Sequence, residues 1–244
     1  MGEDPIKFCR NILSKVSRSF ALTIPMLDDN INKPIMITYL QDRLLDNFED
    51  EIPELSLKKR KYLMDRVVDI FDPENQHFQD SLQEVKNKAQ LLEDKSLKRL
   101  TENADLLKRA HDSMEKEIKI ISYKWLQEMN KGMQKYLEKD VQTFPELDEY
   151  CYYVAGTVGG FLTETIINKE KITENNEKVL LNNFKDAGLF LQKVNLVRDV
   201  RKDIKSRDKN YWPLQSLNMK EEELLDSQNE KEALTALKKM LTNV

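Results

Sequence analysis

Apolar residues recur every three to four positions along most of the chain, and no segment alternates long enough to predict a strand. Prolines fall at the edges of these apolar segments, and Pro34 is expected to open one of them. The long segment 95–138 should break near Gly132 or earlier. The pattern predicts helices over 4–15, 34–50, 55–71, 78–93, 95–138, 146–168, 176–206 and 229–242.

The helices are expected to form a single all-α domain over residues 1–244. Residues 84–140 combine dense Lys, Glu and Asp with spaced Leu, Ile and Met, which is typical of amphipathic helices with a solvated face. No repeat of fixed period, low-complexity tract or Pro/Gly-rich linker divides the chain. The low usage of glycine and proline, 6 and 7 residues, also argues against a many-stranded architecture.

Composition excludes several classes of protein. Charged residues make up 34% of the chain and apolar residues 40%, which predicts a globule that is neither disordered nor membrane-embedded. A net charge of −4 disfavours nucleic-acid binding. No apolar run approaches the roughly 20 residues of a membrane span. Cys9 and Cys151 lie among apolar neighbours, as buried inert thiols do, and indicate a reducing, cytoplasmic location.

One predicted helix carries a polar stripe on an otherwise apolar surface. Tyr39, Arg43, Asp46 and Asp50 are spaced by four, three and four residues, which places them on one narrow arc, with Glu49 beside it. Most of the remaining positions are apolar, which indicates a helix buried on several sides. The carboxylates are therefore expected to point inward.

The segment 187–203 repeats this pattern. Gln192, Asn195, Asp199 and Asp203 step by three, four and four onto one face. Apolar residues occupy its other faces, namely Leu189, Phe190, Leu191, Val194, Leu196, Val197 and Val200.

Two converging groups of carboxylates favour a divalent metal. Carboxylates in an apolar site cannot all stay ionised unless a cation joins them. Oxygen ligands without His or Cys select Mg²⁺, which takes further ligands from water and phosphate oxygens. The sequence therefore predicts a phosphorylated substrate. The alternative is that each stripe is a solvated face that pairs with neighbouring Lys and Arg.

Helical glycines and a tyrosine add candidate chemistry. Gly156, Gly159, Gly160 and Gly188 fall inside helical patterns, where each costs up to about 1 kcal/mol relative to Ala. Close helix packing and room for a ligand explain them equally well. Tyr150 lies in an apolar stretch, where a phenol needs a hydrogen-bond partner, and it is a candidate proton donor or acceptor.

Four segments, in order along the chain, resemble the squalene/phytoene synthase family. They are Ser17-Arg-Ser-Phe20, Tyr39-x-x-x-Arg43-x-x-Asp46-x-x-Glu49-Asp50, Tyr150-Cys-x-Tyr-Val-Ala-Gly156, and Phe190-Leu-Gln-Lys-x-Asn195-x-x-Arg198-Asp199-x-x-x-Asp203 followed by Tyr211-Trp-Pro213. The resemblance implies an all-α isoprenoid synthase fold in which two acidic helices face each other across a pocket.

The resemblance also implies roles for individual residues. The metal ligands would be Asp46, Glu49, Asp50, Asp199 and Asp203. Contacts to diphosphate or NADPH would come from Arg18, Arg43 and Arg198. Tyr150 matches a proposed acid/base, and Phe20 matches a pocket-lining aromatic. Further substrate contacts are expected at Ser17, Tyr39, Gln192, Asn195 and Lys209.

The implied activity is the head-to-head condensation of two farnesyl diphosphates, through presqualene diphosphate, to squalene. Its cofactors would be Mg²⁺ and NADPH. Coupling of prenyl diphosphates without reduction, as phytoene and dehydrosqualene synthases perform it, is the alternative within the fold. Peripheral membrane contact during product release is a further expectation.

The chain departs from the family pattern at three points. Lys202 stands where an acid usually precedes the last Asp, and Lys209 stands where the family usually has Arg. The chain is also expected to lack the family's last helices, which complete the hydrocarbon pocket. This predicts that Phe20, Leu189 and the segment 156–161 are partly uncovered. A catalytically incomplete fragment, or a subunit completed by a partner chain, is therefore a second reading.

Overall fold

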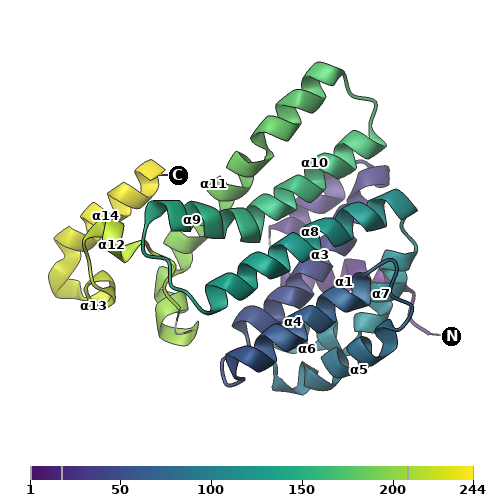
Figure 1. Ribbon diagram of the computed structural model, residues 1–244, viewed down its shortest axis with the longest axis horizontal. Helices are drawn as coiled ribbons and strands as arrows, with labels where there is room; N and C mark the ends of the chain where they lie inside the picture. The colour runs from purple at the N-terminus through teal and green to yellow at the C-terminus, as the bar shows by residue number, and fades with distance from the viewer. Residues whose placement is uncertain (1, 18, 208, 244) are drawn as a thin grey trace.

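The computed structural model describes residues 2–17, 19–207 and 209–243, and all regular structure in this part of the chain is helical. Figure 1 shows the arrangement of the helices. The α-helices are α1 (Pro5–Val16), α2 (Phe20–Thr23), α3 (Asp29–Asp50), α4 (Leu57–Phe71), α5 (Phe78–Lys88), α6 (Lys95–Glu102), α7 (Ala104–Asp112), α8 (Lys116–Leu137), α9 (Phe144–Cys151), α10 (Thr157–Lys169), α11 (Glu174–Arg207), α12 (Leu214–Leu217), α13 (Glu221–Leu225) and α14 (Glu230–Asn243). Short 3₁₀ or π segments are η1 (Ile24–Met26), η2 (Ala89–Leu91), η3 (Tyr152–Gly156) and η4 (Ser227–Asn229).

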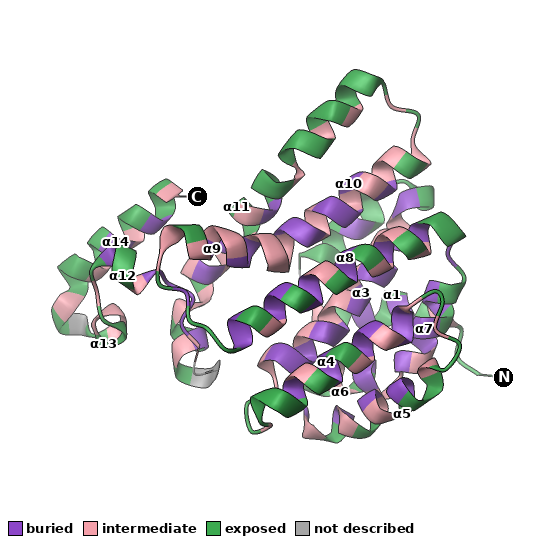
Figure 2. Cartoon of the chain, viewed as in Figure 1, coloured by how far each residue is buried: buried purple, intermediate pink, exposed green. Residues whose placement is uncertain are grey.

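Helix α3 lies at the centre of the larger apolar core and packs against α1, α4, α7, α8 and α10. Its side chains Ile37, Leu40, Leu44 and Phe48 are fully buried, as expected for a helix that is apolar around much of its circumference. The purple positions along α3 and α8 in Figure 2 mark this core. The core holds α3 rigidly, so the polar stripe on its remaining face has a fixed position.

A second apolar cluster joins the C-terminal helices to the rest of the chain, at the left of Figure 1. The indole Nε1 of Trp212 donates a hydrogen bond to the carbonyl of Leu196 at 3.1 Å. The buried ammonium of Lys193 bonds both to the carbonyl of Asn243, at the end of α14, and to Asp148, at 2.7 Å each. Val154 packs against both clusters, which makes the two cores continuous.

Helix α3 begins earlier than the sequence pattern predicted. It starts at Asp29, so Pro34 lies inside it and does not open it. Proline in the second turn removes one backbone hydrogen bond, but the ring of Pro34 is buried, and packing offsets part of that loss. The prediction that Pro34 marks the boundary is therefore wrong by about one turn.

The predicted helix over 95–138 is three helices, and its breaks lie earlier than Gly132, as the prediction allowed. The first interruption is at Asn103, whose side chain bonds to the carbonyl of Arg99 and competes with the helix ladder. The second lies between Asp112 and Lys116. Gly132 lies inside α8, and the ring of Tyr153 packs directly against it: a Cβ at this position would lie 1.9 Å from Cγ of Tyr153.

Candidate active site

The two acidic stripes face one cavity. This cavity has a volume of about 390 Å³ and is bounded by α2, α3, α8, α9, η3, α10, α11 and Tyr211. The carboxylates on its wall are Asp42, Asp46 and Asp50 from α3, and Asp199 and Asp203 from α11. Residues 46 and 199 are 153 positions apart in sequence, so the fold brings the two stripes together as the sequence predicted.

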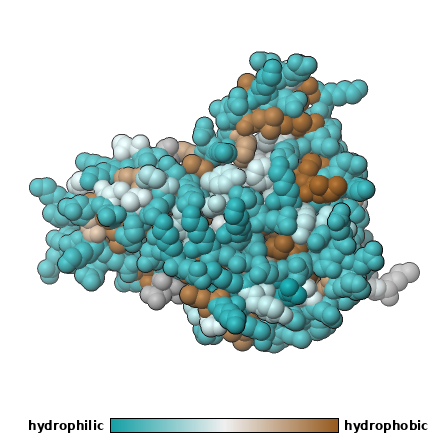
Figure 3. Space-filling view, viewed as in Figure 1, coloured by the Kyte–Doolittle hydropathy of each residue, from teal (hydrophilic) through white to brown (hydrophobic). Residues whose placement is uncertain are grey.

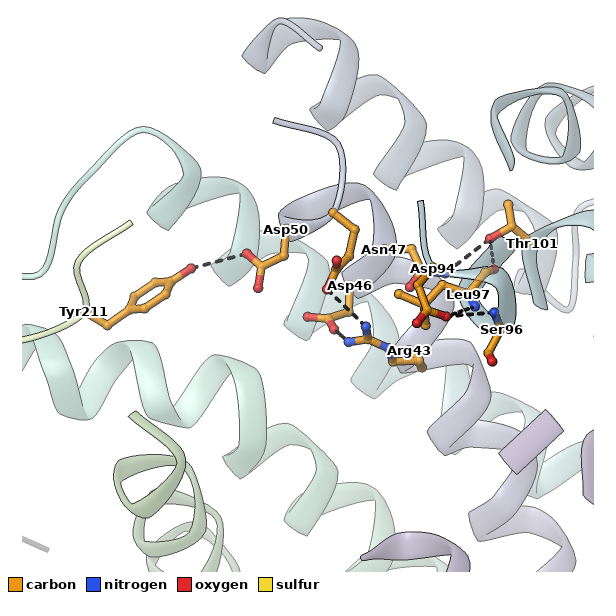
Figure 4. Close-up of polar contacts among 10 residues, drawn as sticks. Arg43, Asp46, Asn47, Asp50, Asp94, Ser96, Leu97, Thr101 and Tyr211 are labelled. Atoms are coloured by element: carbon orange, nitrogen blue, oxygen red, sulfur yellow. Dashed lines mark hydrogen bonds and ion pairs between the residues drawn. The ribbon is translucent and has the colours of Figure 1, made fainter. Parts of the chain in front are cut away.

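On the α3 side, ion pairs and a tyrosine hold the acidic side chains. Arg43 forms an ion pair with Asp46, and its second terminal nitrogen lies 3.3 Å from Oε1 of Glu51. The hydroxyl of Tyr211 donates a hydrogen bond to Oδ1 of Asp50 at 3.4 Å. Figure 4 shows Arg43, Asp46, Asp50 and Tyr211 in this arrangement. Arg43 therefore compensates the charge of the stripe in this state.

Glu49 lies differently from its neighbours. Its side chain is only 2% exposed, and it does not line the cavity. It adds negative charge near Tyr150 and Tyr211. The structure thus separates Glu49 from the cavity-lining carboxylates with which the resemblance grouped it.

On the α11 side, Arg198 and Asp199 form a two-bond pair. The guanidinium Nε and Nη2 of Arg198 lie 2.9 and 2.5 Å from the two oxygens of Asp199, and this contact raises the pKa of Arg198. Asp203 is buried, with 4% exposure, and also lines the cavity. Gln192 and Asn195 line the same wall, as predicted from their spacing.

The donor chemistry of this wall fits Mg²⁺ in the presence of a phosphate ligand. Asp46, Asp50, Asp199 and Asp203 supply oxygen donors from opposite sides of the cavity, and no His or Cys of the described residues lines it. No three acidic, His or Cys side chains of the described residues converge closely enough to hold a metal by themselves. Phosphate oxygens would therefore have to complete the coordination shell.

An aromatic group closes the cavity next to Asp50. The rings of Tyr150 and Tyr211 stack with centroids 4.4 Å apart, and Tyr136 meets Tyr150 edge-on at 5.3 Å. Burial raises the pKa of Tyr150 well above its usual value, and the neighbouring Tyr211, Glu49 and Asp50 further disfavour a negative charge on its phenol. Tyr150 is therefore a neutral phenol at physiological pH.

A π-helical turn shapes the wall between α9 and α10. Residues 152–156 form η3, where the sequence pattern predicted an uninterrupted helix. A Cβ on Gly188 would lie 2.5 Å from the carbonyl oxygen of Ala155, and one on Gly159 would lie 2.6 Å from that of Phe184. These glycines allow α11 to approach η3 and α10, and both also line the cavity. Close packing and room for a ligand therefore both apply to Gly159 and Gly188, whereas Gly156 and Gly160 show close packing only.

Asp42 is a cavity residue that the sequence analysis did not single out. It lies one turn before Asp46 on the same face of α3. Burial raises the pKa of its carboxyl to about 8. Its spacing of three from Tyr39 and four from Asp46 was the available signal, but the motif leaves its position open.

The remaining predicted site residues are distributed as follows. Phe20 and Tyr39 line the cavity, and their ring centroids lie 4.8 Å apart. Burial raises the pKa of Tyr39, and a hydrogen bond with Ser17 partly offsets that increase.

Ser17 caps α1 and is not a lining residue. The ammonium of Lys209 bonds to the carbonyls of Tyr136 and Leu137 at 3.0 and 3.3 Å, so it caps α8 and does not face the cavity. Arg18 lies outside the described residues.

One side of α11 is uncovered. Phe190, Leu191 and Val194 are 51%, 54% and 40% exposed, so this apolar face of the helix lacks a covering element, in line with the expectation of a partly open apolar side. No described element covers the side of α11 that carries these three residues. Among the seven apolar residues of segment 187–203 named above, only Leu196 is fully buried. Phe20 is 38% exposed and Leu189 is half-buried, as expected.

The segment 156–161 was expected to be partly uncovered; Val158 and Gly159 are half-buried and line the cavity, whereas the other four residues are buried. A Cβ on Gly160 would lie within 2.3 Å of the indole of Trp125, and Phe161 is 2% exposed, because α10 packs on α8. Figure 3 shows brown apolar side chains on the projecting end formed by α10 and α11.

Both cysteines are buried, and burial raises the pKa of Cys9 and of Cys151 to about 12, as predicted for unreactive thiols. Within residues 2–17, 19–207 and 209–243, no helix is long and apolar enough to cross a bilayer.

Comparison with known proteins identifies the architecture. The chain is 33% identical over 247 residues to inactive squalene synthase 2 of Arabidopsis thaliana, covering 99% of this chain and 56% of that protein. It is 34% identical over 241 residues to squalene synthase of Nicotiana benthamiana, covering 97% of this chain and 54% of the relative. The chain thus spans about half the length of these relatives.

The solved structure of TcSQS with the ligand BPH1237 superposes with a TM-score of 0.82 at 26% identity, covering 98% of this chain and 67% of that one. The fold is therefore the all-α isoprenoid synthase fold that the resemblance implied. The sequence model for squalene/phytoene synthase matches residues 13–244. With nearly the whole chain matched, this protein belongs to the squalene/phytoene synthase family.

Proposed function

We propose that the chain catalyses head-to-head condensation of two farnesyl diphosphates, through presqualene diphosphate, to squalene. The observation that carries this proposal is the division of one cavity into a charged end and an apolar end. Four carboxylates and the guanidinium groups of Arg43 and Arg198 stand at one end, and Met129, Val158, Leu162 and Leu191 line much of the rest. This combination suits a ligand with a diphosphate head and a hydrocarbon tail.

The charged residues would bind and orient the two diphosphate heads. Asp46, Asp50, Asp199 and Asp203 are the residues that would hold Mg²⁺, which when bound neutralises the charge that develops on the leaving diphosphate. Arg43 and Arg198 now pair with Asp46 and Asp199, so each would have to release its carboxylate to contact phosphate oxygens. The two guanidinium groups are suited to bidentate phosphate contacts.

The apolar residues would hold the prenyl chains and exclude water from the carbocations that follow diphosphate departure. Tyr150 would stay a neutral phenol next to Asp50 and can donate a hydrogen bond to a leaving oxygen. Arg18, Arg43 and Arg198 would contact the diphosphates or NADPH, which when bound would supply the hydride that ends the reaction. We also propose that residues 1–244 form one domain, since Val154 packs against both apolar clusters.

A second candidate is a helical subunit that becomes active only when a partner chain completes the apolar wall. The exposure of Phe190, Leu191 and Val194 favours it. Non-reducing coupling of prenyl diphosphates is the alternative reaction at the same site.

Product analysis tests these proposals. The purified chain would be incubated with farnesyl diphosphate and Mg²⁺, with and without NADPH, and diphosphate release and hydrocarbons would be measured. Squalene that forms only with NADPH supports the proposal, and a more unsaturated C30 hydrocarbon without NADPH supports non-reducing coupling. Absence of diphosphate release under all conditions would refute catalysis by this chain alone and favour the partner subunit.

A further inference from the structure

The proposed condensation needs a proton acceptor inside the cavity. Once one farnesyl unit has lost its diphosphate, the double bond of the second attacks its C1 and leaves a tertiary cation. Closing the cyclopropane ring then requires a C–H bond on that C1 to break. Its electron pair forms the third ring bond, and the proton must pass to a base. No oxidant or reductant takes part in this step.

Asp42 occupies the position between the two ends of the cavity. Along α3 the lining residues run Tyr39, Asp42, Arg43, Asp46 and Asp50. At 1.5 Å per residue, Asp42 lies about 6 Å along the helix axis from Asp46, in the direction of the aromatic pair formed by Tyr39 and Phe20. A reacting C1 lies one bond from the diphosphate head and continues into the apolar tail. It would therefore stand near this turn of α3.

The carboxyl of Asp42 also has no hydrogen-bond or ion-pair partner among the described residues. Arg43 pairs with Asp46 and Glu51, and Arg198 pairs with Asp199, whereas no hydrogen bond or ion pair reaches Asp42 from the described part of the chain. Its surroundings raise its pKa to about 8 through burial alone, which is close to the value at which a general base works best near neutral pH.

Tyr150 is less suited to this step. Its phenol is buried between Tyr136 and Tyr211, and its pKa is raised well above that of a free tyrosine. A neutral phenol can donate a proton but is a weak acceptor. Two groups with pKa values this far apart in one cavity suggest a division of roles between donor and acceptor.

We propose that Asp42 is a catalytic residue that accepts the proton released from C1 when the cyclopropane ring closes. This inference rests on the proposed function and adds to it the identity of the base. The carboxylate of Asp42 becomes a carboxylic acid in the step, and the ring carbons retain all the electrons of the broken C–H bond.

The test compares Asp42→Asn and Asp42→Glu with the unaltered chain, and Asp80→Asn serves as a matched control because Asp80 is an exposed acid on α5. The assay measures formation of the cyclopropyl C30 diphosphate from farnesyl diphosphate and Mg²⁺ without NADPH. We expect Asp42→Asn to lower kcat about 100-fold or more, Asp42→Glu to keep part of the activity, and the control to be unchanged. The Kd of a non-ionising thiodiphosphate analogue should stay within about twofold in all variants.

A kinetic isotope effect separates this role from a structural one. With substrate deuterated at C1, Asp42→Asn should show a larger isotope effect than the unaltered chain, because proton removal becomes rate-limiting. Asp42→Asn activity within about threefold of the unaltered chain, an unchanged isotope effect, or a parallel loss of analogue binding would overturn the role of Asp42. If the unaltered chain forms no cyclopropyl product, the proposed function fails and this inference fails with it.

Discussion

The charges of the cavity predict that Mg²⁺ and a prenyl diphosphate bind together and that each binds poorly alone. Four carboxylates, Asp46, Asp50, Asp199 and Asp203, face two guanidinium groups, Arg43 and Arg198, across the lining of the cavity. A diphosphate without metal meets this excess of negative charge and is repelled. Metal alone finds no group of three converging ligands among the described residues. The bound pair of ligands should therefore stabilise the fold far more than either one.

The size of this stabilisation follows from linkage. A ligand present at 100 times its Kd adds about 2.7 kcal/mol to the free energy of unfolding. Unfolding entropy near 2.1 cal/mol/K per residue gives about 0.5 kcal/mol/K for 244 residues. The expected increase in Tm is therefore about 5 °C.

Differential scanning fluorimetry with a farnesyl thiodiphosphate analogue checks this expectation in four conditions: no ligand, Mg²⁺, analogue, and both. Asp199→Asn should abolish most of the Tm increase seen with Mg²⁺ and analogue together. The substitution removes one oxygen ligand for the metal, so the diphosphate would keep Arg198 as a contact but lose part of the metal site. Asp80→Asn, on the surface of α5, should leave the shift intact. Equal stabilisation by Mg²⁺ with and without the analogue would refute a shared site.

Three further predictions concern packing, pH and surface. Gly188→Ala should lower the free energy of unfolding by about 1–3 kcal/mol in urea, since the added Cβ meets the carbonyl of Ala155 at 2.5 Å, whereas Gly2→Ala, with open space around it, should not. Burial lowers the pKa of His111, so as the pH falls the unfolded state binds the proton before the folded state does. The free energy of unfolding should therefore decrease below about pH 6.5. In denaturation measured at several pH values, His111→Phe should reduce this decrease. Phe190→Ser should reduce binding of an apolar dye and any self-association in sedimentation, because the ring is 51% exposed; unchanged dye binding would contradict this.

The sequence predicted the charged end of the cavity well because that end depends on helical periodicity. Asp46 and Asp50, and likewise Asp199 and Asp203, are four residues apart, so each pair must share a face of its helix. For Glu49, its position next to the stripe in sequence was a weaker indication that it lines the cavity. Glu49 lies about 100° around the helix from Asp50, and that rotation is enough to bury it outside the cavity.

Other features depend on contacts that no local pattern contains. The π turn at 152–156 coincides with the close approach of α11, which requires Gly188 opposite the carbonyl of Ala155. The sequence shows glycines in both segments, but the contact between Gly188 and the 152–156 turn depends on how the helices pack in three dimensions. Lys209 had the charge expected of a phosphate contact, yet the nearby carbonyl end of α8 binds its ammonium.

The two ends of the cavity differ in how they are stabilised, and this difference bears on activity. The charged end is built from α3, α11 and Tyr211, and every acidic stripe there is held by contacts within the described chain. On the apolar end, Leu191 lines the cavity and is also 54% exposed, with Phe190 and Val194 beside it in the same state. Burying each such side chain stabilises the covered state by about 1.5–3 kcal/mol. A segment or chain that covers this wall would therefore gain several kcal/mol of binding free energy. Water that reaches the wall would also reach a carbocation held against it. On the proposed function, the described helices would therefore supply contacts to the diphosphate head, whereas protection of the reactive intermediates would depend on what covers α11.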